Sequence, residues 1–556
     1  MQISKIEKLA LIIISLFLCI GLIYLAGGPI FSDEFLYLDL GLRNVSEPSY
    51  GNRYFHVYLQ KLFVSIFPTP LIGVRVFWSV LISITTALVY LNARKLTKKS
   101  SILHGLLAVA FFFAFPLIRE YSGEPAVDIS AMTMTVIYLT VYLWGTKNPK
   151  KLPKTLFVLG LLSFLSLKTK ETTIFINILL VGFVIKRFKE KLSVKNVYMF
   201  FRPFLFGIAA GIGVFIILDS VFLGNPFFAI SPSTFGSIFT HYDFGVGFFN
   251  GPTSWYSIYF LDELLLPFIL FLLGGIQLQN KVERDIRIVW IYPLVLAAFV
   301  SWNMLKIPWG FIERFYFPAL PVVAILAPQV VRFEFPKKKR EWIWFIFSIL
   351  FSVVLAWFMR SYWLNISKQY YFDYARMLNA VYYPMLISLL LAIIVWENRS
   401  GWKWTIIQLF CIGSLLFSPL VSNYKYFVTH PKIKERYTVL LYPFETFKNQ
   451  FALQENDLVF VSGNIKDNEN MLSKDPNDIV GMYNFFFDAR ITRDNVFLGY
   501  DENKTGANLT SREFSYVLLT ENDVRRLKDA QLWDEIRGKY TQLDSDQEGT
   551  IFLLSK

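Results

Sequence analysis

The sequence has few charged residues and very few cysteines and histidines. Only 17% of its 556 residues are charged, and it contains 2 cysteines and 4 histidines. About a quarter of the residues in a soluble globular protein are charged, so this scarcity argues against a soluble chain. Cys19 and Cys411 both lie inside apolar runs, which indicates buried thiols and excludes a disulfide framework or a cysteine metal site.

Several motifs are also absent. No GxxxxGK[ST] phosphate loop occurs, so ATP-driven transport is not expected. We find no internal repeats and no low-complexity tracts. The net charge of +13 does not indicate nucleic-acid binding, because the basic residues fall in short clusters between apolar segments, as topology signals do.

Apolar residues dominate the chain. Hydrophobic residues make up 54% and aromatic residues 18% of the sequence, which predicts an integral membrane protein. The first apolar run, Leu9 to Leu25, is too long for a typical signal peptide and is interpreted as a retained transmembrane helix. Thirteen segments are long enough to span a bilayer: about 8–27, 70–92, 101–118, 128–145, 153–168, 172–188, 200–223, 259–278, 286–303, 313–331, 342–360, 378–396 and 403–421.

The basic residues predict the orientation. They concentrate in alternate connections between the predicted spans, and by the positive-inside rule those connections are cytoplasmic. The N-terminus is then cytoplasmic and the C-terminus extracytoplasmic. Clusters that carry this pattern are Arg94-Lys95, Lys150-Lys151, Lys186-Arg187 and Lys337 to Arg340.

The opposite side gathers unusual charges close to the membrane boundary. Charges at membrane depth are expensive and mark function or pairing, so their shared side predicts one extracytoplasmic polar site. The candidate residues are Asp33, Glu34, Glu124, Asp128, Lys168, Lys170 and Arg314, together with His241 in a long outer loop. Two amphipathic stretches on this side, 33–43 and 54–67, are predicted to be interfacial helices.

The composition changes near residue 424. The last 133 residues hold 21 of the 42 acidic residues, whereas the preceding part is strongly basic. Predicted strands at Asp457–Ser462, Ser515–Thr520 and Thr550–Leu554, with a predicted helix at Asp523–Lys539 beginning near Thr520, indicate a small extracytoplasmic α/β domain. No catalytic motif appears in it, so an acceptor-docking or capping domain is the simplest interpretation.

An extracytoplasmic site with carboxylates and cations, and no nucleotide motif, suits a substrate that brings its own energy. A lipid-linked, phosphate-activated donor meets that requirement. Lys168, Lys170 and Arg314 are suited to neutralise a phosphate leaving group. Asp33 is suited to deprotonate an acceptor hydroxyl.

The sequence resembles the GT-C superfamily of polyprenyl-phosphate-sugar-dependent glycosyltransferases, closest to the protein O-mannosyltransferase and aminoarabinose-transferase branch. The resemblance covers about residues 1–335. It rests on Asp33-Glu34 after the first span, the acidic loop Tyr121 to Asp128, the turn Lys168-Thr169-Lys170-Glu171, and Glu313-Arg314-Phe315-Tyr316-Phe317-Pro318.

The resemblance implies a GT-C-like, polytopic α-helical membrane protein and an inverting transfer from a polyprenyl-phosphate-linked sugar to an extracytoplasmic acceptor hydroxyl. Asp33 would be the general base, Glu34 would help place the sugar or acceptor, and Lys170 and Arg314 would hold the donor phosphate. The expected modules are a catalytic part at 1–335, further transmembrane helices at 336–423 and a soluble domain at 424–556.

Metal dependence stays open at this point. Some branches of the superfamily use a divalent cation and others do not. Glu124, Asp128 and His241 are chemically suited to bind Mg²⁺ or Mn²⁺. The second acidic loop is not diagnostic of one branch, so the sugar and the acceptor are also open.

Structural alternatives exist for the same residues. Asp33 and Glu34 suit the first turn of a helix capped by Ser32, and Lys168 and Lys170 suit interfacial snorkelling. Asp219, near the outer end of a span, is either paired with a basic neighbour or simply interfacial. Rival functions are a secondary transporter or flippase, which would show inverted repeats, and a non-enzymatic assembly or export protein.

Overall fold

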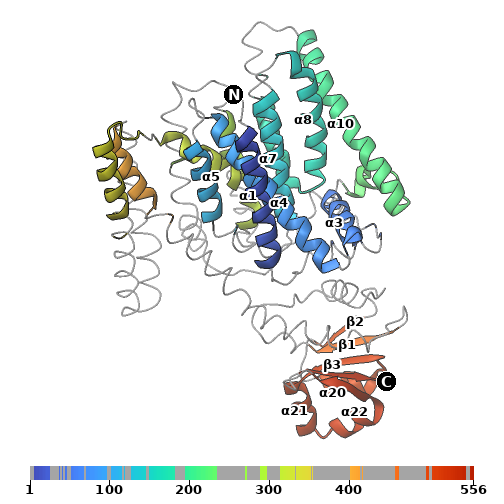
Figure 1. The fold of residues 1–556 in the computed structure, drawn as a ribbon. Helices are drawn as coiled ribbons and strands as arrows, with labels where there is room; N and C mark the ends of the chain where they lie inside the picture. Colours follow the sequence, from blue (N-terminus) through green and yellow to red (C-terminus); the bar gives the residue numbers. More distant parts are fainter. Residues whose placement is uncertain are drawn as a thin grey trace.

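The computed structural model describes more than half of the helical part and less than half of residues 424–556 (Figure 1). The described residues are 5–25, 52–67, 70–96, 102–115, 127–145, 149–181, 194–234, 288–296, 313–331, 334–351, 401–413, 457–462, 496–499, 504–545 and 551–556, with a few single positions such as Tyr37 between them. Asp33, Glu34, Glu124 and His241 lie outside the described residues, as do most of the predicted spans at 259–278 and 378–396.

The long apolar runs form helices at the predicted places. The longest are α1 (Lys5–Leu25), α4 (Pro70–Leu96), α7 (Val127–Gly145), α8 (Leu152–Leu167) and α10 (Val194–Leu223), and each lies within a few residues of a predicted span. Among the described helices, residues 72–96, 127–145 and 201–223 are long and apolar enough to cross a membrane. Helix α5 (Ile102–Ala114) is shorter than predicted.

Large apolar side chains face outward along several of these helices. Phe17 of α1 is 71% exposed, and Ile217 and Val221 of α10 are 65% and 70% exposed. In water such a surface would cause aggregation, whereas in a bilayer it contacts lipid. The outward apolar surface therefore supports a membrane-embedded helical part.

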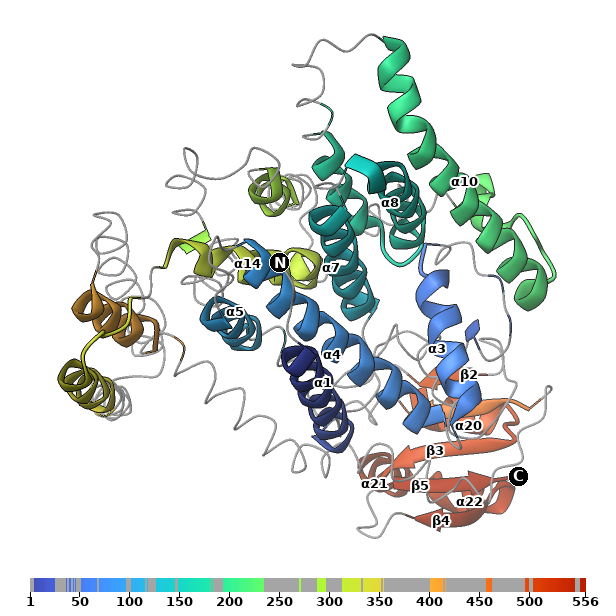
Figure 2. The same ribbon diagram turned by 45° about the horizontal axis from the view of Figure 1, so that its top comes forward.

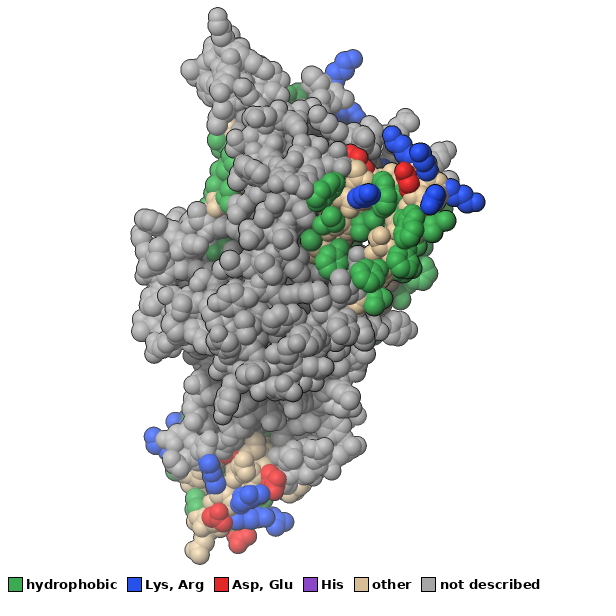
Figure 3. Space-filling view, turned by 90° about the vertical axis from the view of Figure 1, so that its left-hand side faces the viewer, with side chains coloured by type: hydrophobic (Ala, Val, Ile, Leu, Met, Phe, Trp, Pro, Cys, Tyr) green, Lys and Arg blue, Asp and Glu red, His purple; other side chains and the backbone are tan. Residues whose placement is uncertain are grey.

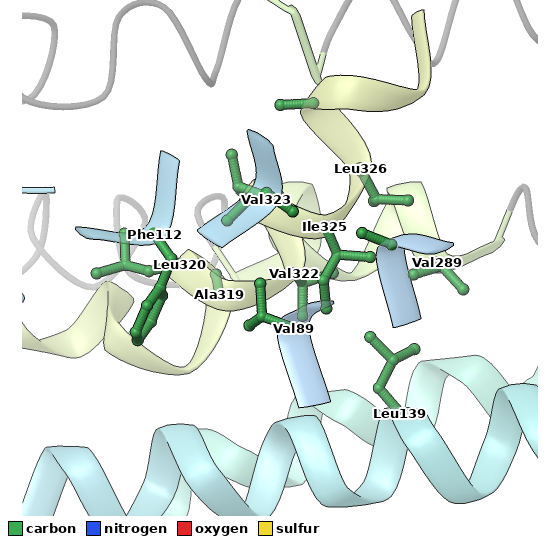
Figure 4. Packing of buried hydrophobic residues seen from close by; sticks show 14 of the residues in the cluster. Val89, Phe112, Leu139, Val289, Ala319, Leu320, Val322, Val323, Ile325 and Leu326 are labelled. Carbon is green, nitrogen blue, oxygen red and sulfur yellow. The ribbon is translucent and has the colours of Figure 1, made fainter. Parts of the chain in front are cut away.

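A broken helical segment forms the centre of the hydrophobic core. The predicted span 313–331 consists of the 3-10 helix η7 (Glu313–Ala319), α14 (Leu320–Leu326) and the 3-10 helix η8 (Ala327–Val330). Every residue of α14 is buried. Figure 4 shows side chains of α14 packed between residues of neighbouring helices, among them Val89 of α4 and Leu139 of α7. This segment is thus surrounded by protein.

Glycines allow α8 and α10 to pack in very close contact. A Cβ atom added at Gly160 of α8 would lie 2.0 Å from the Phe204 carbonyl oxygen, and one at Gly207 of α10 would lie 1.9 Å from the Phe157 carbonyl oxygen. Small residues at such spacing are typical of membrane helix pairs, because dispersion contacts increase as the backbones approach. The two helices lie side by side in Figures 1 and 2.

The two ends of the helical part differ in chemistry. Where α1 begins and α4 ends, Arg94 forms an ion pair with Glu7, and the Lys95 ammonium lies 3.9 Å from the centre of the Trp144 ring at the end of α7. Asp128 at the start of α7 and Lys168 after α8 lie at the other end. Arg94 and Lys95 therefore lie at the end of the helical part opposite Asp128 and Lys168.

The C-terminal domain contains a five-stranded mixed sheet in the order β2-β1-β3-β5-β4. Strand β1 (Val459–Ser462) pairs in parallel with β2 (Val496–Gly499) and with β3 (Tyr516–Thr520). Strand β5 (Ile551–Ser555) pairs antiparallel with β3 and with β4 (Thr541–Ser545). The three predicted strands are confirmed, and β2 and β4 are additional.

The predicted helix Asp523–Lys539 is wrong as a single element. It forms α21 (Glu521–Asp529) and α22 (Trp533–Lys539), separated by Gln531, whose φ of 58° ends the first helix. The predicted start is confirmed, because Thr520 and Asp523 form a reciprocal capping box. Helix α20 (Thr505–Ser511) joins them around a core that includes Phe460.

Candidate functional site

The turn between α8 and the 3-10 helix η3 (Glu171–Asn177) carries three charged side chains into the protein interior. Lys168 is 0% exposed, Lys170 is 2% exposed and Glu171 is 9% exposed. An unpaired charge is costly to bury, so each needs a specific partner. The interpretation of the two lysines as snorkelling residues does not agree with this burial.

Lys170 is paired with Asp128. Its ammonium donates a hydrogen bond to Oδ1 of Asp128, which lies in the first turn of α7 and is fully buried. Among the described residues, Oδ2 of the same carboxylate has no hydrogen-bond partner. The sequence placed both residues on one side of the membrane, and the fold brings them into contact from elements 42 positions apart.

Glu171 is paired with Arg53, which the sequence analysis did not single out. The guanidinium donates hydrogen bonds to both carboxylate oxygens, with a distance of 2.9 Å between Nη2 and Oε1. Arg53 directly precedes α3 (Tyr54–Ile66) and is 7% exposed. A fork-shaped pair of this kind fixes orientation as well as distance. The only sequence signal was an arginine in the loop that also holds Asp33.

Lys168 contacts residues on either side of Arg53. Its ammonium lies 3.2 Å from the Asn52 side-chain oxygen, and its backbone carbonyl accepts a hydrogen bond of 2.9 Å from the Phe55 amide. Lys168 lies in the turn after α8, outside the helices. Burial lowers the pKa of its ammonium to about 8, and the negative charge of Asp219 acts in the opposite direction.

Helix α3 also contacts the other helices that form the site. Nδ1 of His56 lies 2.8 Å from the Ser130 hydroxyl on α7, and the Tyr58 hydroxyl donates to Asp219 of α10 at 2.6 Å. Asp219 is fully buried and also accepts a hydrogen bond from the Ala229 amide. The stretch predicted to be an interfacial helix thus turns its polar face into the protein.

Arg314 belongs to η7, which packs against α7 and η3. The side chains of Tyr316 and Phe317 in the same 3-10 helix are buried. The backbone around Arg314 is therefore close to the elements that carry Asp128 and Glu171. Asp33, Glu34, Glu124 and His241 cannot be placed relative to this cluster, because they lie outside the described residues.

The described residues contain no group of three His, Cys, Asp or Glu side chains that could hold a metal ion. Asp128 is the one predicted metal-binding residue whose position is described. One of its oxygens is occupied by the Lys170 ammonium. A positive charge in contact with the carboxylate disfavours a second cation there.

We use the name buried charge cluster for Arg53, Asp128, Lys168, Lys170, Glu171 and Asp219. It holds three cations and three carboxylates, all at the end of the helical part where α7 begins and α8 ends. Such a cluster can bind an anion if a ligand replaces a carboxylate as partner of a lysine, because ammonium groups held in a dry site interact strongly with phosphate.

The fold is a membrane-embedded helical part with an appended α/β domain, and the buried charge cluster lies at one end of the helical part. The structure matches ArnT from Cupriavidus metallidurans bound to undecaprenyl phosphate, with a TM-score of 0.56 and 12% identity over 100% of this chain and 98% of that chain. The apo state of the same ArnT gives a TM-score of 0.55 and 11% identity, over 99% of this chain and 98% of that one. The predicted polytopic helical fold with a small C-terminal α/β domain is confirmed, and the number of spans stays a prediction.

The sequence itself is divergent. No protein-family model and no curated protein matches it. At 12% identity, the likeness to ArnT establishes the fold, and the function has to be argued from the residues of the site.

Proposed function

We propose that this protein is an integral-membrane glycosyltransferase that moves a sugar from a polyprenyl-phosphate donor to an extracytoplasmic hydroxyl acceptor. The observation that carries the proposal is the buried charge cluster, in which Lys168 and Lys170 of one turn lie beside Arg53 in a fold that is similar to ArnT. An ArnT of that fold has been solved with undecaprenyl phosphate bound.

In the proposed reaction, Lys168, Lys170 and Arg314 hold the donor phosphate. Asp33 takes the proton of the acceptor hydroxyl, and Glu34 helps place the sugar or acceptor. The acceptor oxygen forms a bond to the anomeric carbon while the bond from that carbon to the phosphate oxygen breaks. The electron pair leaves with the polyprenyl phosphate, and attack from the opposite face inverts the anomeric carbon. The cations stabilise the charge that develops on the leaving phosphate.

The pairing of Lys170 with Asp128 suits this role. In the absence of donor, the carboxylate keeps the buried ammonium charged and oriented. A donor phosphate would take over Lys170, and Asp128 would then be available to accept hydrogen bonds from the sugar hydroxyls. We assign no step to a metal ion, because the ammonium next to Asp128 does not fit a divalent cation.

The orientation is part of the proposal. The N-terminus is cytoplasmic, and the buried charge cluster and the 424–556 domain are extracytoplasmic. Support comes from the location of the Arg94–Glu7 pair and Lys95 at the end opposite the cluster. The division into 1–335, 336–423 and 424–556 follows the same interpretation.

The test is turnover with a panel of polyprenyl-phosphate sugars, measured as release of polyprenyl phosphate from the purified full chain. We expect Asp33→Asn to lower kcat at least about a hundredfold, which is the contribution of general base catalysis, while thermal unfolding stays unchanged. Near-normal turnover of Asp33→Asn would refute the assignment of the base. Movement of the intact donor across the bilayer without release of polyprenyl phosphate would support a flippase instead.

A further inference from the structure

A basic segment stands directly at the start of an exposed apolar helix, far in sequence from the buried charge cluster. Lys337, Lys338, Lys339 and Arg340 are consecutive and exposed, and the helix occupies residues 339–351. Figure 3 faces the side of the molecule where this helix lies and shows Lys and Arg side chains gathered at one end of a broad hydrophobic surface.

The helix that follows exposes large apolar side chains on several faces. Trp342, Ile343, Trp344 and Phe347 have exposed fractions between 40% and 64%. Tryptophan at the boundary between a charged and an apolar region is typical of the membrane interface, where its ring fits the headgroup level. The order cations, tryptophans, other apolar residues therefore follows the order headgroup, interface, acyl chain.

The aromatic rings of Phe335, Trp342 and Phe345 pack together beside the basic segment and are called the ledge below. The rings of Phe335 and Trp342 are stacked with centres 5.9 Å apart and planes 7° apart, and Trp342 also packs edge-on against Phe345 at 5.4 Å. Phe335 is 46% exposed. Phe335 precedes the basic segment and Trp342 and Phe345 follow it, so the mutual contacts of the three rings connect the chain on both sides of that segment.

A second helix, residues 402–413, completes this surface. The Thr405 hydroxyl donates to the Glu334 carbonyl at 3.0 Å and accepts from the Glu334 amide at 2.9 Å, so the second helix is tied to the chain just before the basic segment. Lys403 at its start is exposed, with its ammonium 5.9 Å from the centre of the Trp402 ring. It adds a fifth cation.

Two acidic residues reduce the positive charge without removing it. The Glu341 carboxylate accepts hydrogen bonds from the backbone amides of Lys337 and Lys338, both at 3.2 Å, and so is used to cap the helix. Glu334 is exposed. Five cations against two carboxylates leave a net charge of +3 on residues 334–341 and Lys403.

We propose that Lys337 to Arg340 and Lys403, beside the ledge, form a binding site for the headgroup of an anionic phospholipid of the bilayer. The cations bind the headgroup phosphate, and the acyl chains lie along the exposed apolar face of residues 342–351. Short basic clusters beside a membrane helix attract anionic lipids in this way. Charge complementarity selects an anionic lipid over a zwitterionic one.

The chain offers a matched comparison cluster. Lys150, Lys151 and Lys154 are also exposed and stand at the start of an apolar helix. However, the first turns of that helix bury Leu152 and Leu156 inside the protein. This cluster has the same net charge of +3 beside a smaller exposed apolar surface, on which Phe157 is 37% exposed, so it separates specific lipid binding from simple attraction to a charged surface.

The test uses the full chain in nanodiscs containing zwitterionic phospholipid and a minor fraction of phosphatidylglycerol. Lipid retained on the protein after transfer to detergent is measured by native mass spectrometry. We expect the triple variant Lys337→Gln, Lys338→Gln, Lys339→Gln to lower phosphatidylglycerol retention at least about tenfold, since each cation near an anionic surface contributes several-fold. The triple variant at Lys150, Lys151 and Lys154 should leave it unchanged.

A third variant tests the ledge. Trp342→Leu keeps an apolar side chain but removes the ring, and we expect it to reduce retention less than the loss of three charges does. Equal loss in both lysine triple variants, or equal retention of zwitterionic and anionic lipid by the unmodified chain, would overturn the proposal. Lipid retention does not depend on catalysis, so this measurement tests the lipid site independently of the proposed function. Thermal unfolding of each variant shows whether the fold is intact.

Discussion

A buried ammonium or carboxylate is stable only when a partner of opposite charge or several hydrogen bonds replace its water. The turn 168–171 contains three such groups, and the partners come from distant parts of the chain: Asn52 for Lys168, Asp128 for Lys170 and Arg53 for Glu171. At the scale of single residues, the site is a set of charges that fix one another in place. Two predictions concern these groups: the first tests the mutual dependence of Arg53 and Glu171, and the second the titration of Lys168.

The first prediction concerns the Arg53–Glu171 pair. Arg53→Met should lower the free energy of unfolding by about 3–5 kcal/mol, because it leaves the Glu171 carboxylate buried without its partner. Glu171→Gln should also destabilise the protein. The double variant Arg53→Met, Glu171→Gln should lose much less than the sum of the two, because neither charge remains unpaired.

Chemical unfolding of the three variants in detergent measures the coupling, and the chain contains its own control. Arg525 and Glu521 form an exposed pair at 3.0 Å with 66% and 55% of their side chains accessible. Arg525→Met should cost no more than about 0.5 kcal/mol, because solvent screens that pair. Strictly additive losses at Arg53 and Glu171 would show that the two side chains do not depend on each other.

The second prediction is a pH dependence set by Lys168. Burial lowers the pKa of this lysine to about 8, so the ammonium that is proposed to hold the donor phosphate loses its proton as the pH rises through about 8. The ratio kcat/KM should therefore fall above pH 8. The decline of kcat should occur at a higher pH than the decline of kcat/KM, because a bound phosphate stabilises the Lys168 ammonium.

Replacement by arginine separates this group from others that titrate. Arginine stays protonated throughout this range, so Lys168→Arg should lose the decline above pH 8, at whatever absolute rate it retains. An unchanged decline in Lys168→Arg would assign the titration to another residue. Stability should change with pH in the opposite direction to activity. Between about pH 8 and the ordinary lysine pKa, the folded state holds fewer protons than the unfolded chain. The folded state therefore gains stability as the pH rises through this range.

At the scale of elements, helix α3 and the α8–α10 pair determine the geometry of the site. Helix α3 makes side-chain contacts with α7 through His56 and with α10 through Tyr58, while the residues before it hold the lysine turn. Helix α8 ends at that turn, so its distance from α10 sets how far Lys168 lies from Asp219. The close approach of α8 and α10 depends on glycine.

The third prediction tests that approach. Gly207→Ala should destabilise the protein by about 1–3 kcal/mol, because the added methyl group would lie 1.9 Å from the Phe157 carbonyl oxygen and force the helices apart. Gly213→Ala in the same helix is the control, since nothing lies within 4 Å of its added Cβ. This control should be neutral or slightly stabilising, because alanine favours helix more than glycine does.

Thermal unfolding and donor binding should be measured on both glycine variants. Separation of α8 from α10 would also move the lysine turn, so we expect Gly207→Ala to weaken donor binding while Gly213→Ala does not. If Gly207→Ala were as stable as Gly213→Ala, the contact between the two helices would be looser than the backbone distances indicate.

At the scale of the whole molecule, a helical membrane part and a strand domain share one chain. Figures 1 and 2 both show the strand domain at the end of the helical part nearest α3. The strand domain has its own core, formed by residues such as Phe460, Phe514 and Leu527. The buried charge cluster lies at the same end of the helical part, where α3 begins.

The sequence by itself determined the long helices, three of the strands and the common end at which Asp128 and Lys170 lie. Apolar run length predicted α1, α4, α7, α8 and α10 within a few residues, because backbone hydrogen bonds in lipid require a helix. Capping chemistry predicted the start of α21 at Thr520. Loop charge predicted that Asp128 and Lys170 share one end, since topology depends on local charge and not on packing.

Only the tertiary structure decided which charges meet. Arg53 had no distinguishing pattern in the sequence, because its partner Glu171 is 118 residues away. The tertiary structure also decided whether Asp219 is paired with a basic neighbour or simply interfacial. Asp219 is fully buried and accepts hydrogen bonds from Tyr58 and the Ala229 amide. It also acts electrostatically on Lys168 and so is not simply interfacial. Pairing across helices depends on how the helices pack, and hydrophobic periodicity describes single helices. The polar face of α3 could therefore be assigned to the protein interior only once α7, α10 and the lysine turn were in place around it.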